Sequence, residues 1–246
     1  MYDGTLQGDA ALARDDERGK VLALTSDGYV SLPPEITNVL EDFSISAWVK
    51  GVGSNETAAL LGMGSGTAQT APYWDIQLNG DSTMSFASSL AAIDTADGCA
   101  QVVDEFVNDG SAWNHIVLSF TKNEGAVVYI NGEETTTTAL PGENDFSVSP
   151  SELGAAMVAI GKDAFNQQTL TNTLIDDYKI YKNAISADDV KEIFKNETPA
   201  PSGGGGSFTY SLNTSVLKNN GGADFDNYDG FWSHENGNDE WDGTGI

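Results

Sequence analysis

Short runs in which apolar and polar residues alternate dominate the chain up to Tyr181. Alternation with a period of two, rich in Val, Ile, Phe and Tyr and interrupted by turn residues, is typical of β-strands that bury one face. Such runs occur at Lys20–Leu24, Tyr29–Leu32, Phe43–Val49, Trp74–Leu78, Thr83–Ala87, Trp113–Phe120, Ala126–Ile130, Met157–Ile160 and Leu174–Tyr181. The pattern predicts an all-β protein.

Turn and helix signals complete this picture. The dipeptides Asn79-Gly80 and Asn131-Gly132 lie between predicted strands, and Asn-Gly tolerates the positive φ of a tight hairpin turn, so two hairpins are predicted. One short helix is predicted at Ser186–Lys195, where Ser186 can cap the first turn and three apolar residues form a stripe. The segment Ala100–Asp109 fits a helical turn or a loop.

The charge and the composition restrict the classes of partner and ligand that the protein is expected to bind. Eleven Lys and Arg stand against 37 Asp and Glu, which gives a formal net charge of −26. Such a surface repels nucleic acid and anionic membranes, whereas its carboxylates suit Ca²⁺, a cation that prefers oxygen ligands. A single cysteine, Cys99, excludes an internal disulfide, and two distant histidines argue against a zinc site or a His-centred triad. No apolar run is long enough to span a membrane.

The clearest boundary follows the predicted helix. Residues 199–207, Pro-Ala-Pro-Ser-Gly-Gly-Gly-Gly-Ser, have the composition of a flexible spacer and look engineered. We therefore predict a main β-sandwich at 1–198, a linker at 199–207, and a segment at 208–246 that completes the same sandwich.

Several stretches together resemble a known family. In chain order they are Asp3–Asp9, Gly28–Pro33, Phe43–Val49, Trp113–Val117, Val128–Gly132, Ile160-Gly161 and Ile175–Ser186. In this order they resemble the laminin-G-like domains of the concanavalin-A-like lectin/glucanase superfamily, in the form found in bacterial carbohydrate-binding modules. The resemblance implies two antiparallel sheets packed face to face in a jelly roll, and a secreted or cell-surface protein. It leaves the function open, because this fold carries lectins, binding modules, hydrolases, lyases and spacers.

The sequence argues against catalysis. Retaining glucanases of this superfamily carry glutamates alternating along one strand, because their two carboxyl groups must stand about 5–5.5 Å apart. That motif is absent: Glu133 and Glu134 are consecutive, and Glu235, Asp239 and Glu240 lie in Gly- and Asn-rich sequence. We predict a non-catalytic domain.

The resemblance also implies a structural calcium. Family members often bind calcium through an aspartate at the start of the last strand together with backbone carbonyls. The corresponding candidates here are Asp176, its neighbour Asp177, Asn213 and the carbonyl of Gly28.

Sugar binding requires an aromatic face for pyranose C–H groups and polar groups that read hydroxyls. In Tyr73–Leu78, alternation places Trp74 on the apolar face and Tyr73 and Gln77 on the polar one, and we name all three as candidates. A loop after Ile160-Gly161 adds Phe165, Asn166 and Gln167, and Trp232 is a further exposed-aromatic candidate. These residues predict a carbohydrate-binding module or lectin domain that takes a glycan or polysaccharide and is monomeric within a larger protein. A structural spacer or protein-binding adhesin domain is the alternative.

Finally, the order of segments suggests a circular permutation. Family members usually open with an apolar strand resembling Phe208–Leu212 and then continue into sequence like Asp3–Asp9. Here the opening strand comes last, behind the glycine spacer. A fused ligand peptide or a truncated second domain are the alternatives.

Overall fold

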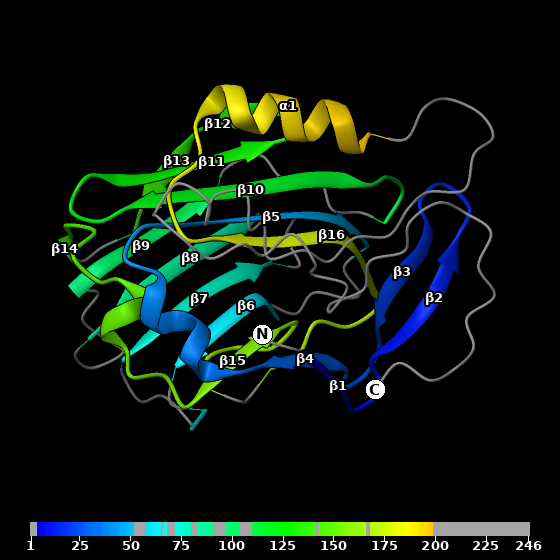
Figure 1. Ribbon diagram of the computed structural model, residues 1–246, viewed down its shortest axis with the longest axis horizontal. Coiled ribbons are helices and arrows are strands. Elements are labelled where there is room, and N and C mark those ends of the chain that lie inside the picture. Colours follow the sequence, from blue (N-terminus) through cyan, green and yellow to red (C-terminus); the bar gives the residue numbers. More distant parts are fainter. Residues whose placement is uncertain are drawn as a thin grey trace, which may run out of the picture.

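The chain forms two β-sheets packed face to face, with one helix outside them (Figure 1). The computed structural model describes residues 4–51, 58–64, 66–67, 72–79, 83–90, 97–103, 110–140, 143–165 and 168–198. All strand pairs are antiparallel except β14 with β9. The predicted all-β sandwich with one short helix is confirmed.

The nine-stranded sheet has the order β1-β4-β15-β6-β7-β8-β9-β13, with β14 beside β9. Its strands are β1 (Thr5–Gln7), β4 (Tyr29–Leu32), β6 (Ala58–Gly64), β7 (Tyr73–Leu78), β8 (Met84–Ser89), β9 (Asp97–Val103), β13 (Thr137–Ala139), β14 (Glu143–Asn144) and β15 (Met157–Ile160).

The seven-stranded sheet has the order β12-β11-β10-β5-β16-β3-β2. Its strands are β2 (Ala11–Asp15), β3 (Gly19–Leu24), β5 (Phe43–Lys50), β10 (Asn114–Thr121), β11 (Gly125–Ile130), β12 (Glu133–Thr135) and β16 (Thr173–Tyr181). Two 3-10 helices, η1 (Pro34–Val39) and η2 (Pro150–Glu152), and the helix α1 (Ala187–Glu197) complete the elements.

The core lies between the sheets and is built on aromatic residues. Trp74 of the nine-stranded sheet packs edge-on against Phe43 and Phe120 of the other sheet, with ring centroids 5.2 and 5.0 Å apart, and stacks beside Phe86. The Trp74 indole N–H donates to the carbonyl of Val148 at 2.8 Å, so the one polar atom of this side chain is satisfied. The predicted core face of Phe43–Val49 is confirmed.

The predicted helix and the hairpin turn at Asn131-Gly132 are confirmed. β7 and β8 pair antiparallel on either side of the other predicted turn, whose Gly80 lies outside the described residues. Asn131 and Gly132 have φ of 53° and 83° and connect β11 to β12. Ser186 caps α1, and its hydroxyl accepts from the amide of Asp189. The undecided segment Ala100–Asp109 is strand as far as Val103, and its remainder lies outside the described residues.

Helix α1 covers the outer face of the seven-stranded sheet, meaning the face turned away from the core (Figure 1). Phe194 of α1 stacks on Trp48 of β5 at 5.6 Å, which explains why Trp48 is buried although it points away from the core. None of the described helices is long and apolar enough to cross a membrane.

Candidate functional site

The outer face of the nine-stranded sheet carries polar side chains along β7. Because side chains alternate along a strand, Trp74, Ile76 and Leu78 enter the core and the residues between them face outward. Of these, Tyr73 and Asp75 are buried and Gln77 is half-buried. The predicted division of β7 into an apolar and a polar face is confirmed.

A loop after β15 folds onto this face and buries it in part. Its backbone rests directly on Gly62 of β6: a Cβ at Gly62 would lie 2.4 Å from the carbonyl oxygen of Lys162. Only glycine allows so close an approach without a shift of the loop. The loop is then tied to β7, because the amide of Ala164 donates to Oδ1 of Asp75 at 2.9 Å.

Phe165 of this loop meets Tyr73 of β7. Their rings lie edge to face with centroids 4.9 Å apart, and Phe165 is half-buried. Next along the strand, the amide nitrogen of Gln77 donates to Oδ2 of Asp75 at 3.3 Å. The Tyr73–Phe165 ring pair thus lies beside the Gln77 amide. The Asp75 carboxyl group holds both the loop and that amide.

Small side chains surround this group. Gly64 and Gly62 of β6 lie opposite Tyr73 and Asp75, while on β8 the residues opposite Asp75 and Gln77 are Ala87 and Ser85. Ala87 and Ser85 are only partly buried. Small, partly buried side chains of β8 thus lie next to Gln77 on this face.

Two acidic side chains, Asp75 and Asp163, are buried in this region. Burial and the neighbouring Asp163 carboxylate raise the pKa of Asp75 well above its usual range, against the opposing effect of the Ala164 amide. Asp163 is itself 4% exposed. The two carboxyl groups lie too far inside to act on a substrate. The Asp75 carboxyl group instead holds the Ala164 amide of the loop and the Gln77 amide.

The candidate sugar-binding side chains therefore differ in where they lie. Tyr73, Gln77 and Phe165 come together on one face. Trp74 is a correction: its side chain is 1% exposed and fills the core on the opposite side of the sheet, so it cannot touch a ligand on this face. Asn166, Gln167 and Trp232 lie outside the described residues.

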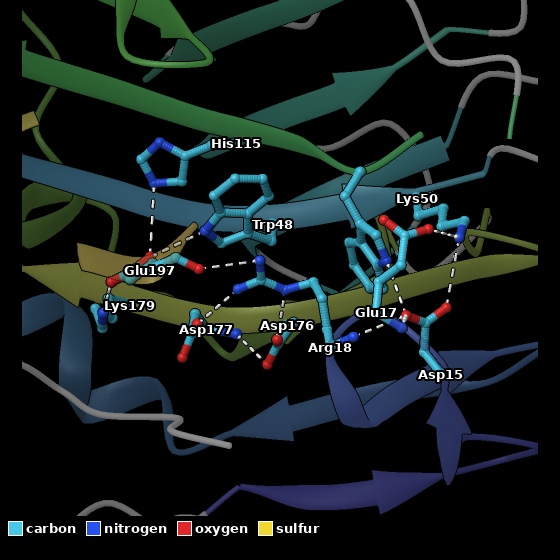
Figure 2. Close-up of polar contacts among 11 residues, drawn as sticks. Asp15, Glu17, Arg18, Trp48, Lys50, His115, Asp176, Asp177, Lys179 and Glu197 are labelled. Carbon is cyan, nitrogen blue, oxygen red and sulfur yellow. Dashed lines mark hydrogen bonds and ion pairs between the residues drawn. The ribbon is translucent and has the colours of Figure 1, made fainter. Parts of the chain in front are cut away.

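On the opposite side of the molecule, Arg18 binds two of the four predicted calcium ligands, Asp176 and Asp177. Its Nε donates to Oδ2 of Asp176 at 2.6 Å and a terminal nitrogen donates to Oδ2 of Asp177 at 2.8 Å (Figure 2). A bulge in β16 makes this possible: Asp177 has φ of 46°, and the pairing with β5 shifts between Asp176 and Lys179. Two consecutive carboxylates thereby reach one guanidinium group.

The end of helix α1 joins the same cluster. Glu197 accepts from Lys179 and from the indole N–H of Trp48, while its backbone carbonyl accepts from Arg18 at 3.2 Å (Figure 2). Arg18 also lies over the Trp48 ring, 4.1 Å from its centroid. These contacts fasten the helix to the seven-stranded sheet through charged groups that are largely removed from water.

Both carboxylate oxygens of Asp176, the first calcium ligand predicted from the resemblance, accept hydrogen bonds from this chain. Oδ2 of Asp176 accepts from Arg18 and Oδ1 accepts from the amide of Asp177. β16 pairs antiparallel with β3, Thr173 opposite Leu24 and Ile175 opposite Leu22. Asp176 therefore lies along β3, whereas Gly28 comes four residues after the end of that strand. Asn213 lies outside the described residues, and within those residues no three His, Cys, Asp or Glu side chains are grouped to hold a metal.

We expect the His115 imidazole in this cluster to stay neutral on acidification. Burial, aided by Lys179 and Arg18, lowers its pKa to about 3 from 6.5, although Glu197 lies 3.8 Å away. The unfolded chain therefore binds the extra proton first, and this histidine's contribution to stability is lost as the pH falls from about 6.5 to about 3. An NMR titration of the ring, assigned with His115→Gln, checks this; a midpoint near 6.5 would contradict it.

Comparison with known proteins identifies the family. A model of the concanavalin A-like lectin/glucanases superfamily matches residues 24–191. The chain belongs to this superfamily. No curated protein matches it in sequence.

Solved structures with the concanavalin A-like fold extend this finding. Domain 4 of AbnA, an extracellular arabinanase from Geobacillus stearothermophilus solved with arabinotriose, superposes with a TM-score of 0.53 at 21% identity, over 77% of this chain and 87% of that domain. The receptor-binding domain of a botulinum neurotoxin C/D mosaic gives a TM-score of 0.55 at 14% identity, over 80% of this chain and 46% of the other. At these identities the likeness shows the fold alone.

Sequence reasoning missed Asp75 and Arg18 as organising residues. Asp75 was visible on the polar face of its strand, but its partner Ala164 is 89 positions away. Arg18 lies in the turn between β2 and β3, where Asp15 accepts from two backbone amides, a local signal for a turn that says nothing of a partner 158 positions away.

Proposed function

We propose that this domain is a non-catalytic carbohydrate-binding module of an extracellular protein, and that its site is the outer face of β7 with the loop that ends at Phe165. The observation that carries this proposal is the Tyr73–Phe165 ring pair next to the Gln77 amide. Rings that present an edge or face to C–H groups, together with an amide for hydroxyls, supply both kinds of contact that sugars require. The AbnA domain solved with arabinotriose supports a glycan as the ligand class.

The described carboxylates support the absence of catalysis. Glu133 and Glu134 are exposed neighbours on the three-residue edge strand β12, so successive side chains point to opposite faces. Asp75 and Asp163 do lie close together, but they are 2% and 4% exposed, under the loop backbone. Neither pair offers the two accessible carboxyl groups that glycoside hydrolysis needs.

The test is glycan-array binding of the full chain, followed by affinity measurements with Tyr73→Ala and Gln77→Ala. Each substitution should weaken binding at least about tenfold, or about 1.4 kcal/mol. Gln77→Ala should leave the melting temperature nearly unchanged, because Gln77 is only half-buried. A matched control is Glu17→Gln on the far sheet, which should keep full affinity. Absence of any glycan signal at high protein concentration would favour the structural spacer instead.

Calcium stays a separate proposal that rests on the resemblance and on the carboxylate-rich composition. If the native chain holds the ion through Asp176, calcium should raise the melting temperature and a chelator should lower it, because a ligand of the native state alone stabilises that state. Melting curves with calcium and with chelator, for wild type and for Asp176→Asn, test it. A wild-type curve that does not respond to either condition would contradict the proposal and leave Arg18 as the partner of Asp176.

We also propose that residues 208–246 complete the sandwich as a permuted N-terminal part. Helix α1 is fastened by Glu197 to Lys179 of β16, so the chain leaves the helix close to the seven-stranded sheet. The nine residues 199–207 can span at most about 30 Å, which suffices to return a segment to that sheet. Deleting residues 203–246 should then leave an unstable or aggregating protein. A truncated protein that melts cooperatively at the wild-type temperature would contradict the permutation.

A further inference from the structure

The positive charge of the described chain is distributed unevenly between the two sides of the sandwich. The basic residues of the seven-stranded sheet, its turns and α1 are Arg14, Arg18, Lys20, Lys50, Lys122, Lys179, Lys182, Lys191 and Lys195. On the side of the nine-stranded sheet the described residues include one more, Lys162. Its ammonium group lies 4.2 Å from the ring centroid of Tyr29, on β4, and β15 and β6 separate β4 from β7.

The Gln77 amide has a defined orientation at the site. Its nitrogen donates to Oδ2 of Asp75, so its carbonyl oxygen points away from Asp75. The other oxygen of Asp75 accepts from the Ala164 amide at 2.9 Å, which holds the carboxyl group in place with Oδ2 facing the Gln77 nitrogen. The Gln77 carbonyl oxygen is therefore left as an acceptor on the side away from Asp75, and an acceptor reads the hydroxyl hydrogen of a sugar.

We infer that the site is specific for uncharged glycans, and that Asp75 is the positioning residue that sets this preference by holding the Gln77 carbonyl oxygen toward the ligand. The inference rests on the proposed function of this face. A uronic or sialic acid carboxylate would meet the Gln77 oxygen and the buried carboxyl groups of Asp75 and Asp163, without a cation from the described part of this sheet. Such an approach costs desolvation and places like charges close together, and the one Lys that the described part of this sheet carries, Lys162, lies against Tyr29.

The first test compares neutral with uronic and sialylated oligosaccharides on the full chain. Neutral ligands should bind at least about tenfold more tightly, and their affinity should change little between low and high salt. Equal affinity for acidic ligands would overturn the inference and leave the proposed function standing. Absence of binding to every class would remove the proposed function itself.

The second test exchanges acid and amide. In Asp75→Asn the introduced oxygen must accept from Ala164, so the introduced NH₂ faces Gln77 and forces its amide to turn; affinity for the neutral ligand should fall about tenfold. Gln77→Glu alone places two carboxyl groups together, and its affinity for the neutral ligand should also fall about tenfold. The double variant Asp75→Asn/Gln77→Glu restores a donor facing an acceptor and should recover most of the affinity, an outcome that a merely structural role would not produce.

Melting temperatures of all four proteins accompany these measurements. If Asp75→Asn does not fold, the comparison of Gln77→Glu with the double variant still decides. A folded double variant that binds no better than Gln77→Glu alone would overturn the positioning role of Asp75.

Discussion

Replacing Arg18 with alanine is expected to lower the free energy of unfolding by about 3–5 kcal/mol, a large part of the roughly 5–15 kcal/mol that domains possess. The side chain is 3% exposed and binds both Asp176 and Asp177. Its removal leaves two carboxylates buried without their cation and also removes the contact with Trp48. Urea unfolding at neutral pH measures the loss.

The free energy of unfolding of Arg18→Ala should depend on pH through the carboxyl group of Asp176. Burial and the charge of Asp177 raise the pKa of Asp176 to about 7 from 3.8 even with Arg18 present. A carboxyl group whose pKa is raised on folding stabilises the native state least above its folded pKa and most when protonated. Arg18 lowers the pKa of Asp176, so in Arg18→Ala this pKa should rise further above about 7. The deficit of the variant should therefore shrink as the pH falls from alkaline values toward about 7, where Asp176 becomes protonated in both proteins, and change little below that.

Lys50→Ala is the matched control. Lys50 also binds two carboxylates, Asp15 at 3.5 Å and Glu17 at 3.0 Å, but Glu17 is 60% exposed in its side chain. Partly solvated pairs of this kind contribute about 0–1 kcal/mol. Equal losses for the two variants, or an Arg18→Ala protein as stable as wild type, would contradict the role given to the buried cluster.

Trp74→Ala is expected to cost about 3–5 kcal/mol as well, for a different reason. The indole fills the centre of the core against Phe43, Phe86 and Phe120, and its loss leaves a cavity and an unsatisfied Val148 carbonyl. Thermal and urea unfolding give the size of the effect. Gln77→Ala, on the other face of the same strand, is the control and should unfold almost as wild type does. If Gln77→Ala destabilises as much as Trp74→Ala, the division of β7 into two faces is wrong.

Alternation of apolar and polar residues was enough to locate the strands that bury one face. It did not locate strands whose sequence does not alternate. Phe43–Lys50 and Asn114–Thr121 alternate because their core sides meet the other sheet, and both were predicted nearly to the residue. Ala58–Gly64 was missed because its sequence, Ala-Ala-Leu-Leu-Gly-Met-Gly, has no polar face: small residues stand where the loop after β15 lies on it. The short edge strands β12, β13 and β14 are too brief to show a period.

The same alternation of side chains predicted part of the candidate site. A period of two places Tyr73 and Gln77 on one face without any knowledge of the fold. What Asp75 does depends on a loop brought back across two strands, and what Asp176 does depends on an arginine from the β2–β3 turn. Such long-range partners leave no local signal, so the ion pair of Asp176 with Arg18 could not be predicted from the sequence.

The proposed β7 site is tested most directly by locating the bound glycan on the full, isotope-labelled chain. The chain is titrated with an oligosaccharide that binds on the glycan array, and backbone chemical-shift changes are followed by NMR. The account predicts that the largest shifts fall on β7, on the partly buried residues of β8 and on the Ala164 amide, with α1 and β16 unchanged. Shifts concentrated on α1 and the seven-stranded sheet, with β7 and Ala164 silent, would contradict it.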